Sequence, residues 1–233
     1  MMKKKIAIIG EFNSGFLSHT RLNDALEHVK TRYGYDFGYD WLDTPLVEKS
    51  SETLLTGYSG IWSAPGSPFL SLEGSLAAIA FARKNRVPHL GTCAGFQHTI
   101  IEFARNVLGE KEAQHEEYDP ESDCLFISRL SCSLSGKEMQ IYLKEGSLAR
   151  SCYGKKEVIE NYYCNFGINP QFKSRLVHPN LQISGVDQDG EIRIIEIPEN
   201  PFFVATLFVP QTRSTPEHPH PLIKAFVEAC LTN

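Results

Sequence analysis

A cysteine between two glycines has the clearest chemical potential in this sequence. Gly91, Cys93 and Gly95 form a GxCxG pattern at the end of a short apolar segment that starts at Val87. Such glycines permit a sharp turn that presents the cysteine side chain clear of the backbone. If a helix starts directly after Cys93, its unpaired N–H groups favour the thiolate, and the N–H of Ala94 can donate to a developing oxyanion. The pattern therefore predicts a nucleophile for acyl chemistry, although a buried structural cysteine in a tight turn gives the same pattern.

The elements needed to position such a turn recur through the first half of the chain. Short apolar runs rich in β-branched residues predict strands, and apolar residues three or four apart predict helices between them. Because strands and helices alternate, this half predicts a parallel sheet. The predicted strands are residues 5–10, 36–42, 60–64 and the segment from 87, and the predicted helices are 18–29, 71–85 and 96–107.

After Pro120 the pattern changes to strands joined by turns. Asp187-Gln-Asp-Gly190 between two apolar runs is a hairpin signal, and residues 222–231 have helical spacing. We therefore expect an α/β fold with a mostly parallel central sheet flanked by helices and an antiparallel β extension in the C-terminal half. The predicted strands of this half are residues 124–130, 139–143, 181–186, 191–197 and 202–208.

Composition excludes several classes of protein. The 233 residues are 42% hydrophobic and 22% charged, which suits a single globular domain over residues 1–233. A net charge of -5 without long runs of one sign gives no electrostatic footprint for nucleic acid. The basic segment from Met1 to Lys5 precedes an apolar run too short for a signal peptide, and no stretch reaches the roughly 20 apolar residues of a membrane span. We expect a cytoplasmic protein that binds neither nucleic acid nor membrane.

The spacing of cysteines and histidines predicts no metal site. The 8 histidines and 6 cysteines include no CxxC or HxxxH set. A chain of this length also folds without disulfide staples. We therefore expect free thiols, no bound metal and no cofactor.

Four longer segments around Cys93 and near the C-terminus carry information about the family of the protein. They are Gly91-Thr-Cys-Ala-Gly-Phe-Gln97, Ile101-Glu-Phe-Ala-Arg-Asn-Val-Leu-Gly109, Ile195-Glu-Ile-Pro-Glu-Asn-Pro-Phe-Phe-Val-Ala-Thr206 and His220-Pro-Leu-Ile-Lys-Ala-Phe-Val-Glu-Ala229. Together they resemble the class I glutamine amidotransferase domain of CTP synthases. The resemblance implies a Rossmann-like sheet and hydrolysis of glutamine through a cysteine thioester. We find no GxxxxGK[ST] phosphate loop and expect no synthetase domain, so a separate synthetase or another protein is a candidate partner.

The resemblance also exposes a degenerate catalytic triad. Where the family has Phe-His-Pro-Glu, this sequence has Phe208-Val-Pro-Gln211. Val209 cannot accept a proton from the cysteine, and Gln211 cannot stabilise an imidazolium by charge. The usual route to a thiolate is therefore predicted to be lost.

Two further positions depart from the family. The glycine-rich oxyanion loop becomes Pro65-Gly-Ser-Pro-Phe69, in which Pro68 supplies no N–H, so Gly66 and Ala94 are the oxyanion candidates. Asn165 stands where the family has the arginine that holds the carboxylate of glutamine. A charge clamp is thereby replaced by a neutral amide.

Other pocket positions match the family. Cys93 matches the nucleophile, Gln97 matches a glutamine-contacting residue, and Glu117 matches the contact to the substrate amino group. His115 beside Glu117 is a candidate substitute base. His218 and His220 are weaker substitutes, because Pro219 between them and the prolines on either side favour an extended surface segment.

Two functions are consistent with these residues. In the first, Cys93 retains a weak or altered amide or acyl hydrolase or transferase activity instead of efficient glutaminase activity. In the second, the protein is a catalytically inactive pseudo-amidotransferase that binds a small metabolite or a partner protein. In either case the expected small-molecule ligand is an amide or resembles an amino acid.

Overall fold

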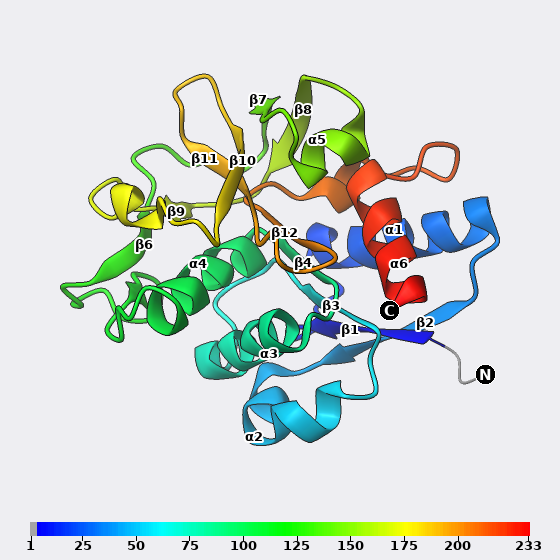
Figure 1. Cartoon of the computed structure of the whole chain (residues 1–233), viewed down its shortest axis with the longest axis horizontal. Coiled ribbons are helices and arrows are strands. Elements are labelled where there is room, and N and C mark those ends of the chain that lie inside the picture. The colour runs from blue at the N-terminus through cyan, green and yellow to red at the C-terminus, as the bar shows by residue number, and fades with distance from the viewer. Residues whose placement is uncertain (1–3) are drawn as a thin grey trace.

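A nine-stranded mixed sheet runs through the computed structural model, which describes residues 4–233 (Figure 1). Residues 1–3 of the basic N-terminal segment lie outside the described part. Strands β2, β1, β3, β4 and β12 pair in parallel, and the remaining strands continue the sheet with antiparallel pairs. In spatial order the strands are β2 (Phe37–Leu42), β1 (Lys4–Ile9), β3 (Gly60–Ser63), β4 (His89–Thr92), β12 (Phe203–Thr206), β11 (Ile192–Glu196), β10 (Gln182–Val186), β7 (Lys137–Leu143) and β8 (Glu157–Tyr162).

Helices cover the parallel half of this sheet on both faces. Helices α2, α3 and α4 pack on one another over one face, and α1 and α6 pack together over the other (Figure 1). The helices are α1 (Leu17–Tyr33), α2 (Thr44–Leu55), α3 (Leu72–Asn85), α4 (Ala94–Asn106), α5 (Leu148–Tyr153) and α6 (Pro221–Thr232), with 3-10 turns η1 (Lys173–Leu176) and η2 (Pro210–Arg213). The expected α/β fold with an antiparallel extension is confirmed.

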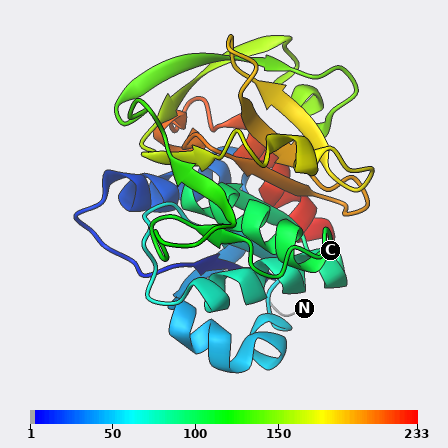
Figure 2. The same ribbon diagram turned by 90° about the vertical axis from the view of Figure 1, so that its left-hand side faces the viewer.

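A small second sheet lies against α4, near the sharp turn at residues 91–95, which we call the elbow. Its strands are β5 (Gln114–His115), β6 (Leu125–Arg129) and β9 (Phe166–Ile168), in the order β5-β6-β9. Figure 2 shows the C-terminal antiparallel strands at one end of the molecule, with α4, α3 and α2 stacked toward the other. None of the helices within residues 4–233 combines the length and apolar composition needed to cross a membrane.

The turn after β4 has the strained geometry that the GxCxG pattern predicts. Cys93 has φ 53° and ψ -103°, a conformation that costs a non-glycine residue free energy. A Cβ atom at Gly95 would overlap the carbonyl oxygen of Ser63, and one at Gly91 would approach the Gly95 carbonyl oxygen to 2.9 Å. The two glycines therefore let α4 begin against β3 and β4, with Cys93 at the corner.

Candidate active site

The turn opens into a cavity of about 200 Å³ at the carboxyl end of the parallel strands. This is where α/β sheets usually place their ligands. Five residues singled out in the sequence line it together: Gly66, Cys93, Gln97, Glu117 and Asn165. Val209, Gln211, His115 and the oxyanion candidate Ala94 do not line it. The remaining lining residues are Phe16, Ser18, Pro65, Ser67, Tyr163, Cys164 and Phe166.

The side chain of Cys93 meets a second thiol in this cavity. Its Sγ lies 2.7 Å from the Sγ of Cys164, whose thiol also donates to the Leu207 carbonyl oxygen at 2.9 Å. Burial raises the pKa of the Cys164 thiol well above its ordinary value. Cys164 therefore keeps its proton at neutral pH and cannot take one from Cys93.

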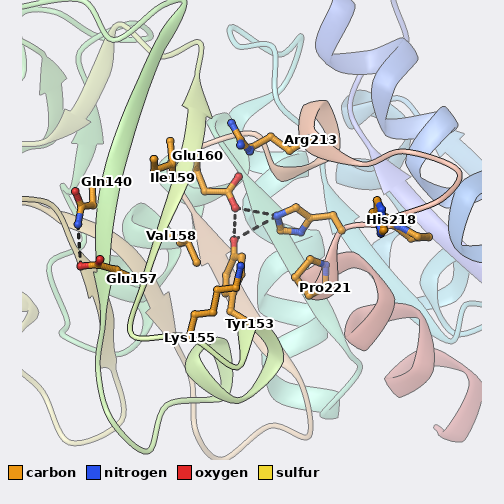
Figure 3. A pocket seen from close by; sticks show the side chains of 12 residues that line it. Gln140, Tyr153, Lys155, Glu157, Val158, Ile159, Glu160, Arg213, His218 and Pro221 are labelled. Atoms are coloured by element: carbon orange, nitrogen blue, oxygen red, sulfur yellow. Dashed lines mark hydrogen bonds and ion pairs between the residues drawn. The ribbon is translucent and has the colours of Figure 1, made fainter.

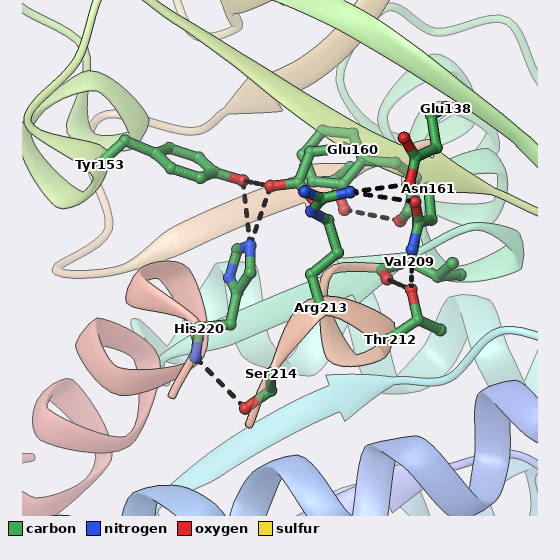
Figure 4. Close-up of polar contacts among 11 residues, drawn as sticks. Glu138, Tyr153, Glu160, Asn161, Val209, Thr212, Arg213, Ser214 and His220 are labelled. Atoms are coloured by element: carbon green, nitrogen blue, oxygen red, sulfur yellow. Dashed lines mark hydrogen bonds and ion pairs between the residues drawn. The ribbon is translucent and has the colours of Figure 1, made fainter. Parts of the chain in front are cut away.

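The triad positions next to the cavity hold no acid–base group. Val209 is fully buried, and its N–H donates to the Asn161 carbonyl oxygen at 2.9 Å. Figure 4 shows its side chain beside Asn161 and Thr212. Gln211 is also fully buried, and its Nε2 donates to the Ser18 carbonyl oxygen at 3.2 Å while its Oε1 has no partner. Neither residue can relay a proton from Cys93.

Gln97 is held in one orientation by two hydrogen bonds. Its Nε2 donates to the Phe166 carbonyl oxygen at 2.9 Å, which leaves its Oε1 to accept from His115 Nε2 at 3.1 Å. In that tautomer His115 Nδ1 accepts the Glu117 backbone N–H at 3.0 Å. Both ring nitrogens of His115 are thus engaged with Gln97 and Glu117 rather than with Cys93. In this arrangement His115 acts as a positioning residue for Gln97.

Glu117 and Asn165 present the polar groups that a ligand can use. Burial raises the pKa of the Glu117 carboxyl, and its Oε2 is buried without a hydrogen-bond partner. The Oδ1 of Asn165 accepts from Ser133 Oγ at 2.6 Å, so its NH₂ group is the part available to a ligand. An amine bound at Glu117 would offset the cost of burying that carboxylate.

His19, a histidine that the sequence did not single out, contacts the loop at residues 65–69. His19 Nε2 lies 2.8 Å from the Pro65 carbonyl oxygen, and a Cβ at Gly66 would approach that nitrogen to 2.5 Å. Gly66 has φ 101°, which favours glycine. Ala94 begins α4, where first-turn N–H groups have no partner within the helix.

A larger cavity of about 540 Å³ lies along β8 and shares no lining residue with the Cys93 cavity (Figure 3). At its base His220 Nε2 lies 2.9 Å from Glu160 Oε1, which also accepts from the Tyr153 hydroxyl at 2.6 Å. The expectation of an exposed segment at His220 is wrong, because this buried polar cluster holds its ring at 4% exposure. His218 is exposed as expected.

Buried histidines make the stability of this protein sensitive to acid. Burial lowers the pKa of His89 and of His115 to about 3. Between pH 6.5 and that value the unfolded chain binds protons that the folded chain does not, so the free energy of unfolding falls as pH falls. Each histidine is expected to remove about 2 kcal/mol between pH 7 and pH 5.

Urea unfolding at the two pH values measures this loss. His89 Nε2 bonds Ser63 Oγ at 3.0 Å, and His89→Gln retains a polar group there without titrating. This variant is expected to lose about 2 kcal/mol less than the wild type over the same range. His218→Gln, at an exposed position, is the matched control and keeps the wild-type dependence. An unchanged pH dependence in His89→Gln would contradict the assignment.

A cysteine on the sharp turn between a parallel strand and a helix of an α/β sheet defines a class of protein. The class I glutamine amidotransferase family model matches residues 19–229, so the chain belongs to that family. Its relatives include the CTP synthases of Saccharolobus solfataricus, 34% identical over 96% of this chain, and of Acidobacterium capsulatum, 35% identical over 98%. The chain spans 44% of the length of each of these two relatives. The resemblance seen in the sequence is confirmed.

Solved structures support the same fold. The glutaminase domain of Trypanosoma brucei CTP synthase with bound acivicin matches with a TM-score of 0.91 at 24% identity, covering 99% of this chain and 95% of that one. A glutamine amidotransferase from Thermotoga maritima matches with a TM-score of 0.64 at 12% identity over the full length of both chains. Within residues 4–233, no group of three or more His, Cys, Asp or Glu side chains is placed to hold a metal ion.

Proposed function

We propose that this CTP synthase-like amidotransferase domain has a degenerate triad and binds a small amide or amino-acid-like ligand without efficient glutamine hydrolysis. The observation that carries the proposal is the contact of Cys93 Sγ with the Cys164 thiol at 2.7 Å. An amidotransferase cysteine must lose its proton before it attacks an amide, and a positioned base contributes about 10²- to 10⁴-fold to such a step. Val209 and Cys164 supply no such base.

The cavity supports a ligand of amino-acid size. Its volume of about 200 Å³ lies below the range of roughly 300 to 1,000 Å³ typical of drug-sized ligands. Glu117 offers its half-buried carboxylate to an amine, and Gln97 is fixed by His115 at the cavity wall. Asn165 offers a neutral NH₂ donor instead of a cation. These groups favour a ligand that has an amine but a weaker negative charge than glutamine.

A slow acyl hydrolase or transferase is the second candidate, and the elbow itself favours it. Cys93 retains the strained φ of 53° and lines the cavity. Ala94 follows it as the first residue of α4, where N–H groups have no partner within the helix. An activated acyl substrate that needs little base assistance would react at this thiol.

Calorimetric titration of the reduced protein with L-glutaminamide, L-glutamine and L-glutamate tests the binding proposal. L-Glutaminamide, which has no carboxylate, is expected to bind at least as tightly as L-glutamine, and L-glutamate more weakly. Glu117→Gln is expected to weaken L-glutaminamide binding about tenfold, because a charge-assisted bond to its amine is lost. Glu121→Gln, at an exposed position, should bind like the wild type.

Two outcomes of this titration would decide against the proposal. Equal affinities in the wild type and Glu117→Gln would exclude Glu117 as the amine contact. Steady heat from turnover of L-glutaminamide, abolished in Cys93→Ala, would instead establish the hydrolase candidate.

A further inference from the structure

Cys93 and Cys164 bring two thiols together from segments 71 residues apart. Cys93 follows β4, and Cys164 lies between β8 and β9. All six cysteines of the chain are free thiols. Both residues of this pair line the same cavity, so a small reagent that enters it lies next to both.

The surrounding backbone holds both residues in place. The Cys93 N–H donates to the Thr206 carbonyl oxygen at 2.9 Å, and the elbow glycines fix the turn around it. The Cys164 carbonyl oxygen accepts the Leu134 N–H at 3.0 Å. The pair is therefore a property of two anchored segments and not of two mobile side chains.

The two thiols differ in a way that assigns them different roles. Cys93 is 8% exposed and stands at the start of the thirteen-residue helix α4. Cys164 is 2% exposed, and its thiol donates to the Leu207 carbonyl oxygen. The more exposed Cys93 is thus suited to react with an oxidant first. Cys164, which is more deeply buried, is then placed to react with the oxidised Cys93 sulfur.

We propose that Cys93 and Cys164 form a dithiol site that small peroxides oxidise to an intramolecular disulfide. In the first step the Cys93 sulfur attacks one peroxide oxygen, the O–O bond breaks, and the departing hydroxide takes up the Cys93 thiol proton to leave as water. In the second step the Cys164 sulfur attacks the Cys93 sulfenic acid, the S–O bond breaks, and the hydroxyl group leaves as water with the Cys164 proton. Two thiols and one hydrogen peroxide become one disulfide and two waters.

This inference shares its cavity with the proposed function and deepens it. Formation of the disulfide removes the nucleophilic thiol of Cys93. A ligand in the cavity then no longer has that thiol to contact. Reduction by a small thiol restores both groups. The proposed ligand site would then exist only in the reduced protein.

The test treats the fully reduced chain with hydrogen peroxide and alkylates the remaining thiols with N-ethylmaleimide before mass spectrometry. The expected product has lost two hydrogens, carries two fewer labels than the reduced protein, and yields a cross-linked peptide pair containing Cys93 and Cys164. Dithiothreitol should return both labels. Cys132, which is exposed, is the internal reference because oxidation that follows exposure alone would reach it first.

Matched variants separate the roles of the two cysteines. In Cys164→Ser, Cys93 sulfenic acid trapped by dimedone should rise about tenfold, because the resolving thiol is gone. Cys93→Ser should form neither the sulfenic acid nor the cross-link, and Cys132→Ser should behave like the wild type. If either cavity variant fails to fold, phenylarsine oxide, which binds paired thiols, should still protect these two cysteines from alkylation in the wild type.

Cross-links to other cysteines, or equal Cys93 sulfenic acid in the wild type and Cys164→Ser, would overturn the proposal. So would failure of phenylarsine oxide to protect the pair. These readouts use no amino-acid ligand, so they are independent of the calorimetric test. Absence of ligand binding in the reduced protein would contradict the proposed function alone.

Discussion

Ammonia release from L-glutamine by this protein is expected to be at least about 10³-fold slower than by a class I glutaminase domain with an intact triad. The base position supplies none of its usual 10²- to 10⁴-fold, because Val209 is apolar. The neutral Asn165 costs roughly a further 10- to 100-fold in binding relative to an arginine at the same position. Both losses act on the same reaction, so the residual rate should be close to that of Cys93→Ala.

Labelling by 6-diazo-5-oxo-L-norleucine measures the same loss by a route that does not depend on detecting ammonia. The reagent needs both a thiolate and recognition of the amino-acid ends, and this cavity lacks the base and the carboxylate clamp. Adduct formation at Cys93, followed by mass spectrometry on the reduced protein, is expected to be much slower than in an intact amidotransferase. Rapid stoichiometric labelling would show that another group activates Cys93.

Local sequence patterns predicted most of the parallel half of the fold. Strands and helices there alternate with clear apolar periods, and the hairpin signal at residues 187–190 lies between β10 and β11 as expected. Helix α2 was not predicted, because its apolar residues are separated by a polar run that contains the non-helical Ser50. Strand β8 was also missed, since as an edge strand it buries few of its side chains.

The candidate site could be predicted only where it follows the chain locally. The elbow at Cys93 depends on glycines next to it in sequence, so the motif predicts its geometry directly. Cys164 and His19 reach the site through tertiary packing from distant segments, and no spacing rule connects them to Cys93. The burial of His220 likewise depends on Glu160, which lies 60 residues away.

Rebuilding the triad with Val209→His and Gln211→Glu is expected to raise glutaminase kcat/KM by about 10²-fold. Both positions are fully buried, so the new imidazole and carboxylate must pair with each other. Each single variant leaves one buried polar group without its partner, and each should be less stable than the double variant. Thermal unfolding of the three proteins measures this non-additivity.

Adding Asn165→Arg to the double variant should improve glutamine recognition more than the chemical step. Position 165 is exposed, so an arginine can extend over the cavity mouth without displacing the core. Its charge-assisted bond to the substrate carboxylate forms in the ground state as well as in the transition state, so KM should fall by about 10- to 100-fold with little change in kcat. Initial rates of ammonia release, each compared with a Cys93→Ala version of the same variant, provide the measurement.

The contact with Cys164 determines how complete this repair can be. An imidazole at position 209 must compete with the Cys164 thiol for Cys93 Sγ, so replacing that thiol in the triple variant by Cys164→Ala should raise kcat further. A folded triple variant that remains at the Cys93→Ala rate with either residue at position 164 would contradict the repair. The oxyanion loop around Gly66 and Pro68 would then be the remaining difference from an active site, because base, orienting carboxylate and clamp would all be present.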